Sequence, residues 1–216
     1  MTPTALQPAT RVVARSRRRV VFTGGPGAGK TTAIDLLRRE LGERLVVVPE
    51  AGTLLFRGGF PRDAHVPEAQ RAAQRAIYYV QRNLEDAQAA LYPERILLCD
   101  RGTVDGAAYW PEDGDFFRAV GSSYETELAR YDAVVFFETA AAGGISIEGG
   151  NPIRNESLAQ AVALDRRLAQ LWSRHPRFTF IAHEQSFFEK LAHGLAAMKA
   201  CVAELDREAS RCSASA

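Results

Sequence analysis

Residues 24–31 read GGPGAGKT and fit the pattern G-x-x-x-x-G-K-[ST]. Glycines carry no Cβ, so they let successive backbone N–H groups turn inward onto a phosphate. Lys30 adds a mobile positive charge for the outer phosphates, and the hydroxyl of Thr31 can bind Mg²⁺. The alternative, a glycine-rich turn that binds nothing, is disfavoured because an apolar run precedes the loop and a helical pattern follows it. The stretch therefore predicts a site for the phosphates of a nucleoside triphosphate.

Lysine usage supports a chemical role for Lys30. It is the only lysine in the first 189 residues, where arginine is abundant. Because the chain uses arginine for nearly all of its other positive charges, a lysine at this position indicates a functional requirement.

An aspartate and an arginine end another apolar run, in the sequence ILLCDR at residues 96–101. A buried strand that ends in Asp100 matches the second element of such sites, which binds Mg²⁺ directly or through water. Hydrolysing enzymes commonly place a glutamate next to activate water, whereas Arg101 can stabilise charge on a phosphoryl group during transfer. The alternative is a structural ion pair at the end of the strand.

Glu50 follows the apolar run 45–48 and a proline. In a parallel sheet the carboxyl end of that strand lies on the same edge as Lys30 and Asp100. A carboxylate there can accept a proton from an attacking hydroxyl, as a general base does. It can equally orient substrate hydroxyls or cap a helix.

Arg154 lies near the end of the glycine-rich stretch 138–155. A connection this long in a compact domain is usually functional or disordered. Flexible glycines would let the stretch close as a lid and bring Arg154 onto the triphosphate. The alternative is a solvated loop arginine; Glu156 and Asp165 are nearby candidates to pair with it.

These residues need elements to position them, and the pattern of the chain predicts an α/β fold with a five-stranded parallel sheet flanked by helices. The expected strands lack in/out alternation, as strands buried on both faces do. They are residues 20–22, 45–48, 96–99, 133–137 and 178–181. The expected helices are 32–41, 67–91 with Pro67 in its first turn, 158–172 with Asn155 as its cap, and 187–205.

Composition limits the classes of function. The 216 residues are 46% hydrophobic and 25% charged with a net charge of +1, so no global field attracts nucleic acid or membrane. We expect one domain over 19–205, between a basic flexible arm at 1–18 and a flexible tail at 206–216. No apolar stretch is long enough for a membrane span, and three cysteines show no metal-like spacing, so a cytoplasmic protein is expected.

Several stretches resemble one family of P-loop proteins, the AAA-type ATPases of the ribosylnicotinamide-kinase-like kind, which are related to nucleoside and nucleotide kinases. They are VFTGGPGAGKTT, VVPEAG, CDRGTVDGAAYW, NPIRNE, LDRRLAQLW and FIAHEQSFFEK, spread over about residues 19–198. The resemblance implies a P-loop kinase-like fold with a lid loop.

The resemblance also implies roles for individual positions. Asp100 and Thr31 would bind Mg²⁺, and Arg154 would contact the triphosphate from the lid. Glu50, Arg101 and Asp105 would face the acceptor. The residues implied to hold the phosphates are Gly25, Pro26, Gly27, Ala28, Gly29, Lys30, Thr31 and Thr32. Those implied to border the adenine include Gln185, Ser186 and Phe187.

Two functions are compared. The first is a kinase that transfers the γ-phosphoryl of ATP, with Mg²⁺, to a hydroxyl of a nucleoside-like small molecule. The second is a regulatory ATPase or GTPase acting through a protein partner; GTP is less expected because no N-K-x-D motif is present. A homodimer is compatible with either. Side chains expected on the acceptor side, besides those above, are Arg57, Arg62, Tyr78, Gln81 and Tyr109, with Tyr78 equally compatible with the core.

Overall fold

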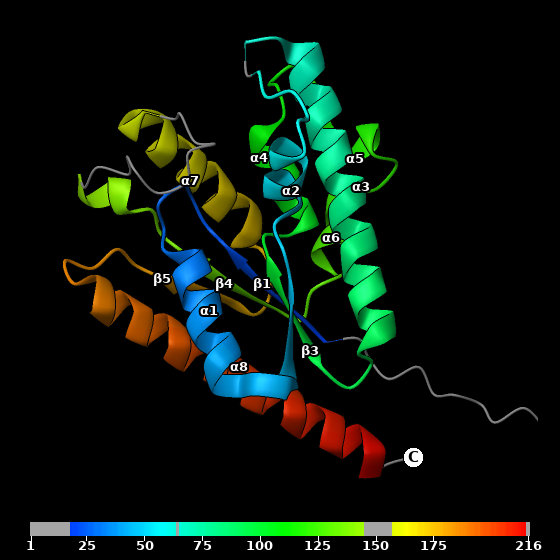
Figure 1. The fold of residues 1–216 in the computed structure, drawn as a ribbon, viewed down its shortest axis with the longest axis vertical. Helices are drawn as coiled ribbons and strands as arrows, with labels where there is room; N and C mark the ends of the chain where they lie inside the picture. The colour runs from blue at the N-terminus through cyan, green and yellow to red at the C-terminus, as the bar shows by residue number, and fades with distance from the viewer. Residues whose placement is uncertain (1–17, 64, 145–156, 215–216) are drawn as a thin grey trace, which may run out of the picture.

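The computed structural model describes residues 18–63, 65–144 and 157–214. Its centre is a sheet of five parallel strands in the order β2-β3-β1-β4-β5 (Figure 1). The strands are β1 Arg19–Thr23, β2 Leu45–Val48, β3 Ile96–Asp100, β4 Ala133–Phe137 and β5 Phe178–Ile181. The predicted α/β fold with five parallel strands is therefore confirmed.

Alternate residues of the central strands β1, β3 and β4 face opposite apolar cores. On one face Val20, Phe22 and Leu98 pack against α1 (Lys30–Leu41) and α8 (Phe187–Ala214). On the other face Val21 and Leu97 share a core with residues of α3 (Pro67–Leu91) and α7 (Leu158–Trp172). Burial on both faces explains why the strands read as continuous apolar runs.

Helices therefore cover the sheet in two layers. Figure 1 shows α1 and α8 side by side on one side of it, in contact with each other. The long helix α3 contacts α2 (Ala51–Arg57) and α4 (Gly106–Tyr109). The remaining short elements are η1 Gly42–Arg44, η2 Thr103–Asp105, α5 Phe116–Ala119, α6 Tyr124–Leu128 and η3 Ala140–Gly143.

Some expected boundaries differ from the structure. The connection 49–66 contains a helix of its own, α2, and α1 starts at Lys30 rather than at residue 32. The N-cap of α7 is Ser157, which forms a capping box with Gln160. Asn155, the predicted cap, lies outside the described residues. A serine followed three residues later by glutamine is a recognisable cap signature, so the sequence carried this signal.

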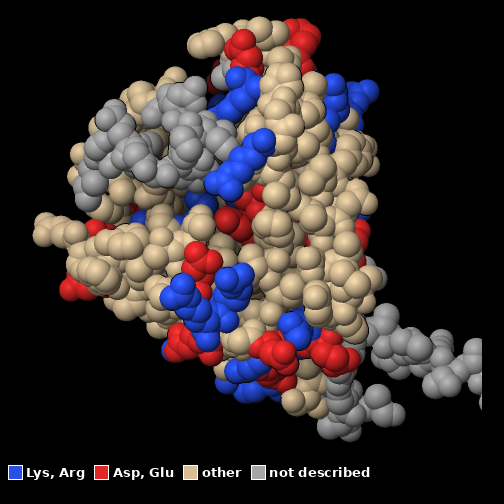
Figure 2. Space-filling model, in the orientation of Figure 1, with Lys and Arg blue, Asp and Glu red and all other residues tan. Residues whose placement is uncertain are grey.

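Residues 206–214, which were expected to belong to a flexible tail, continue helix α8 to Ala214. Its buried stripe runs through Met198, Val202 and Leu205. Ion pairs then extend the contact: Asp206 binds both Arg18, at 2.6 Å, and Arg44. Figure 2 shows acidic and basic side chains interspersed at this end of the molecule. Residues 1–17 of the expected arm lie outside the described residues.

Candidate functional site

The glycine-rich loop connects the end of β1 to the start of α1, and Gly24, Gly27 and Gly29 within it all have positive φ. Gly24 has φ 135°, and a Cβ there would lie 1.9 Å from the carbonyl oxygen of Phe137. Gly29, the N-cap residue of α1, has φ 86°. Both are conformations that a residue with a side chain rarely adopts, so the motif residues fit a tightly folded loop.

Lys30 is 3% exposed and folds back over the loop. Its Nζ donates hydrogen bonds to the carbonyl oxygens of Gly24 and Gly25, at 2.8 and 2.9 Å. Thr31 and Thr32 follow in the first turn of α1 and are exposed. The first N–H groups of a helix have no partner within it, so this end of α1 can receive an anion.

The carbonyl oxygen of Gly25 accepts from Lys30, whereas its N–H is bound by a residue outside the loop. It donates to Oδ1 of Asp165 in α7, at 2.6 Å. The hydroxyl of Thr139, after β4, donates to the carbonyl of Pro26. Two residues predicted to hold phosphate are thus anchored from outside the loop.

Asp100 ends β3 beside the strand that enters the loop, in register with Phe22. The Asp100 carboxylate and the Thr31 hydroxyl are hard oxygen donors, the type that Mg²⁺ prefers. No group of three or more His, Cys, Asp or Glu suited to a metal occurs in the part of the chain that the structure describes. One carboxylate and one hydroxyl are a donor set that fits Mg²⁺ bound mainly through waters and phosphate oxygens.

Arg101 connects two carboxylates at this edge of the sheet. Its Nε donates to Oε1 of Glu50 and its Nη1 to Oδ2 of Asp105, both at 2.8 Å. Arg101 is a non-glycine residue with positive φ, 71°. Burial acts to lower the pKa of Arg101, but Tyr109, Glu50 and Asp105 outweigh it and raise the pKa well above the usual value. The guanidinium is therefore a fixed positive charge.

Glu50 and Asp105 differ in how far each carboxylate is exposed. Asp105 is 4% exposed, and besides Arg101 it accepts hydrogen bonds from Thr23 Oγ1, at 2.9 Å, and Trp172 Nε1, at 2.6 Å. The Glu50 side chain is 22% exposed and accepts from Thr53 Oγ1 at 2.8 Å. Glu50 is consequently the carboxylate better placed to meet a ligand.

A cavity of about 710 Å³ adjoins these groups, large enough for a small organic ligand. Its wall includes Pro26 of the loop as well as Glu50, Arg101 and Asp105. Further along, the wall is built mainly from α3 and from the segment after β3. Residues lining that part include Ala73, Gln74, Ile77, Tyr78, Tyr109, Trp110 and Phe116.

Two predicted acceptor residues line this cavity but use their polar groups internally. The Tyr78 hydroxyl, in a side chain 1% exposed, donates to Glu127 at 2.7 Å. Gln81 is 2% exposed, and its Nε2 donates to Glu85 and to the carbonyl of Arg101, both at 3.3 Å. Gln81 thereby supports the backbone of Arg101.

Sequence reasoning missed Gln74, which lies seven residues before Gln81 on the same buried face of α3. Gln74 is 7% exposed and lines the cavity. Its amide makes no hydrogen bond within residues 18–63, 65–144 and 157–214. The spacing of the two glutamines on one helix face was the available signal.

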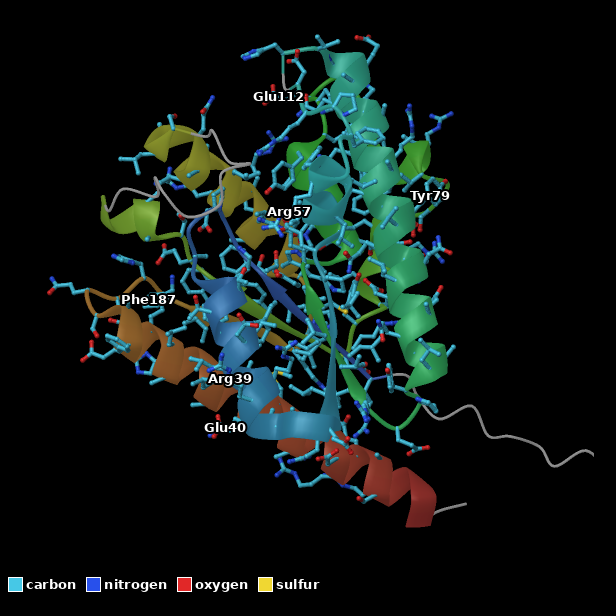
Figure 3. The ribbon with its side chains drawn as sticks, viewed as in Figure 1. Arg39, Glu40, Arg57, Tyr79, Glu112 and Phe187 are labelled. Atoms are coloured by element: carbon cyan, nitrogen blue, oxygen red, sulfur yellow. The ribbon has the colours of Figure 1, made fainter. Side chains whose placement is uncertain are left out.

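The other predicted residues are distributed as follows. Arg62 lines the cavity, and its Cζ lies 5.4 Å from the ring centre of Phe56. Tyr109 also lines the cavity, and its ring centre lies 5.7 Å from Cζ of Arg101. Arg57 ends α2, is exposed, and is not part of the cavity wall (Figure 3). Arg154 lies outside the described residues.

The segment predicted to border the adenine lies at the start of α8. Phe187 is 46% exposed, and its ring would contact a Cβ on Gly29 at 2.7 Å, so it adjoins the loop (Figure 3). Ser186 directly precedes the helix, and its carbonyl accepts from the N–H of Lys190 at 3.2 Å. Gln185 precedes it. The described residues that were predicted for the donor site thus lie in the loop and at the start of α8.

A parallel sheet with this loop after its central strand defines an α/β P-loop NTPase fold. A family model described as an AAA domain matches residues 19–190, and the chain belongs to that family. No curated protein matches the sequence. Among solved structures, deoxyadenosine kinase from M. mycoides with bound dATP is similar in fold, with a TM-score of 0.59 and 14% identity over 84% of this chain and 99% of that one. No helix in the described residues is long and apolar enough to cross a membrane.

Proposed function

We propose that this protein is a phosphotransferase that moves the γ-phosphoryl group of ATP to a hydroxyl of a nucleoside-like small molecule. The observation that carries the proposal is the cavity of about 710 Å³ whose wall includes both Pro26 of the phosphate loop and Glu50. A hydrolase or a switch needs room for water beside the triphosphate. A cavity of this volume, with a carboxylate at its loop end, suits a second substrate.

In the proposed reaction the acceptor hydroxyl gives its proton to Glu50 as its oxygen attacks the γ-phosphorus. The bond from that phosphorus to the oxygen it shares with the β-phosphate breaks, and the electrons leave with ADP. Arg101 holds the Glu50 carboxylate through its Nε and adds positive charge near the transferring group. Asp105 fixes the other end of the same guanidinium.

On the donor side, the loop amides and the start of α1 would hold the phosphates, with Lys30 on the outer ones. Thr31 and Asp100 would hold Mg²⁺, which neutralises phosphate charge when bound. Phe187 and its neighbours would border the base. Arg154 stays a candidate for the outer phosphates on sequence grounds alone.

Support for a nucleoside-like acceptor comes from the far part of the cavity. Trp110 and Phe116 supply aromatic surface, and the Gln74 amide supplies an NH₂ donor group and an oxygen acceptor on one planar group. A planar heterocycle with a polar edge satisfies both features. Its hydroxyl-bearing end would then lie toward Glu50.

The proposal is tested by an acceptor screen with the purified protein, Mg²⁺, and ATP or GTP, read by mass spectrometry. We expect a phosphorylated product that depends on both ATP and a hydroxylated heterocyclic acceptor. Release of inorganic phosphate alone, across the whole panel, would contradict the kinase function and favour the regulatory NTPase.

A further inference from the structure

One position on the apolar face of α7 holds a charge. The buried residues of this helix are Ala161, Asp165, Leu168 and Trp172, at the spacing of one helix face. Asp165 is 5% exposed and is the only acidic residue in the helix. A carboxylate in an apolar stripe is costly unless it is well hydrogen-bonded, so its partners indicate its purpose.

Asp165 connects two loops through a single oxygen. Its Oδ1 accepts from the N–H of Gly25, at 2.6 Å, and from the N–H of Thr139, at 3.1 Å. A Cβ on Gly25 would lie 2.6 Å from this same oxygen. Gly25 has no positive φ, so Asp165, rather than backbone conformation, requires glycine there.

The peptide group that joins Glu138 to Thr139 is held from its other side as well. Nζ of Lys190, in α8, donates to the carbonyl oxygen of Glu138. Lys190 is 3% exposed. One peptide group is therefore bound at its N–H by a carboxylate from α7 and at its oxygen by an ammonium from α8. We call Asp165, Lys190 and this peptide the clamp.

The clamp acts on the first half of the phosphate loop. Asp165 binds Gly25 directly, and the Thr139 hydroxyl binds the carbonyl of Pro26. The second half of the loop leads into the start of α1, where the first N–H groups have no partner within the helix itself. Fixing one end of a short loop limits the conformations of the other, so the clamp restricts where those N–H groups point.

The charges around the clamp explain how a carboxylate is tolerated beside a phosphate site. Burial raises the pKa of Asp165, and the nearby Glu138 carboxylate raises it further. The hydrogen bonds from the N–H groups of Gly25 and Thr139 and the ammonium of Lys30 act in the opposite direction and lower this pKa. Lys190 also faces Asp165 and Glu138. Two ammonium groups thus offset the carboxylate, at a site where phosphate would otherwise be repelled.

We propose that the clamp positions the phosphate loop for the phosphoryl donor, so that Asp165 and Lys190 control nucleotide affinity without touching the nucleotide. The inference rests on the nucleotide-binding half of the proposed function and does not depend on the acceptor.

The test is calorimetric titration of Mg·ADP and Mg·ATP into the full-length protein and its variants. Asp165→Ala removes the acceptor for both N–H groups and is expected to weaken binding by about 10- to 100-fold. Asp165→Asn keeps a neutral oxygen acceptor and is expected to stay within about fivefold of wild type. Arg166→Ala, an exposed neighbour on α7, is the matched control and should bind as wild type does.

A double-mutant cycle separates the clamp from a purely structural role. If Asp165 and Lys190 act through one peptide, then Asp165→Ala combined with Lys190→Met should bind no more than about threefold more weakly than the worse single variant. Independent roles would give the product of the two losses. Hydrogen exchange at the Gly25 and Thr139 amides should accelerate in Asp165→Ala, which is readable even if that variant is less stable.

The outcomes are distinguishable. Asp165→Ala that melts at a lower temperature but binds Mg·ADP as tightly as wild type would overturn the clamp alone, and so would independent losses in the cycle. Wild-type protein with no affinity for either nucleotide would overturn the proposed function and this inference with it.

Discussion

The two halves of the candidate site are built in different ways. The donor half is a backbone structure, in which Lys30 binds loop carbonyls and glycines permit the close turns. The acceptor half is a side-chain structure, assembled from α2, α3, the segment after β3, and α7. A site built from backbone groups needs particular residue types at fixed positions in the sequence. A site built from side chains can be formed by many different combinations of residues. The donor half should therefore tolerate substitution least, and the acceptor half should determine specificity.

The largest effect is expected in the donor half. Lys30→Ala should reduce phosphoryl transfer below detection, because it removes the ammonium group that lies over the phosphate loop. Transfer is measured by product formation, and folding by circular dichroism. The exposed Lys199→Ala is the control and should transfer normally. Turnover that survives in folded Lys30→Ala would refute the phosphate-loop assignment.

Glu50 lies where the two halves meet. Glu50→Gln keeps an oxygen that can accept from Arg101 but lacks a strong base, so turnover should fall by about 10²–10⁴-fold with little change in nucleotide affinity. Single-turnover kinetics with saturating acceptor measure the chemical step. An unchanged rate would leave Glu50 with a binding role only.

A smaller and different effect is expected deep in the acceptor half. Gln74→Leu removes an amide that faces the cavity, so the KM for the acceptor should rise by about 3- to 10-fold while the KM for ATP stays constant. Arg75→Ala, exposed on the same helix, is the matched control. A rise in the KM for ATP instead would contradict the division into two halves.

The last prediction concerns stability near the donor half. Burial lowers the pKa of Lys190 from the usual 10.5 to about 8. Since the folded protein disfavours the charged form, this penalty is full below pH 8 and disappears as the pH rises toward 10.5. The free energy of unfolding of wild type, relative to Lys190→Met, should therefore rise over that interval, by less than about 3 kcal/mol. Urea titrations at several pH values measure it, and parallel profiles would contradict it.

The same contrast explains what could be predicted from the sequence. The five strands, the helices 67–91 and 158–172 and the loop itself were predictable, because buried strands and a glycine motif leave local patterns. The place of Gln74 in the cavity wall and the internal use of Gln81 were not, since both depend on which segments pack against α3. The end of α8 was also missed: ion pairs between Asp206 and distant arginines leave no periodic signal.

The contact between Gly25 and Asp165 has a consequence for the history of this family. In the general motif the position of Gly25 accepts any residue, but here a neighbour 140 positions later forbids a side chain. The two positions are expected to covary. Relatives that retain the aspartate should retain the glycine, and relatives that lose the aspartate should be able to carry a larger residue in place of the glycine. A reading of related genomes could therefore detect the contact without any structure.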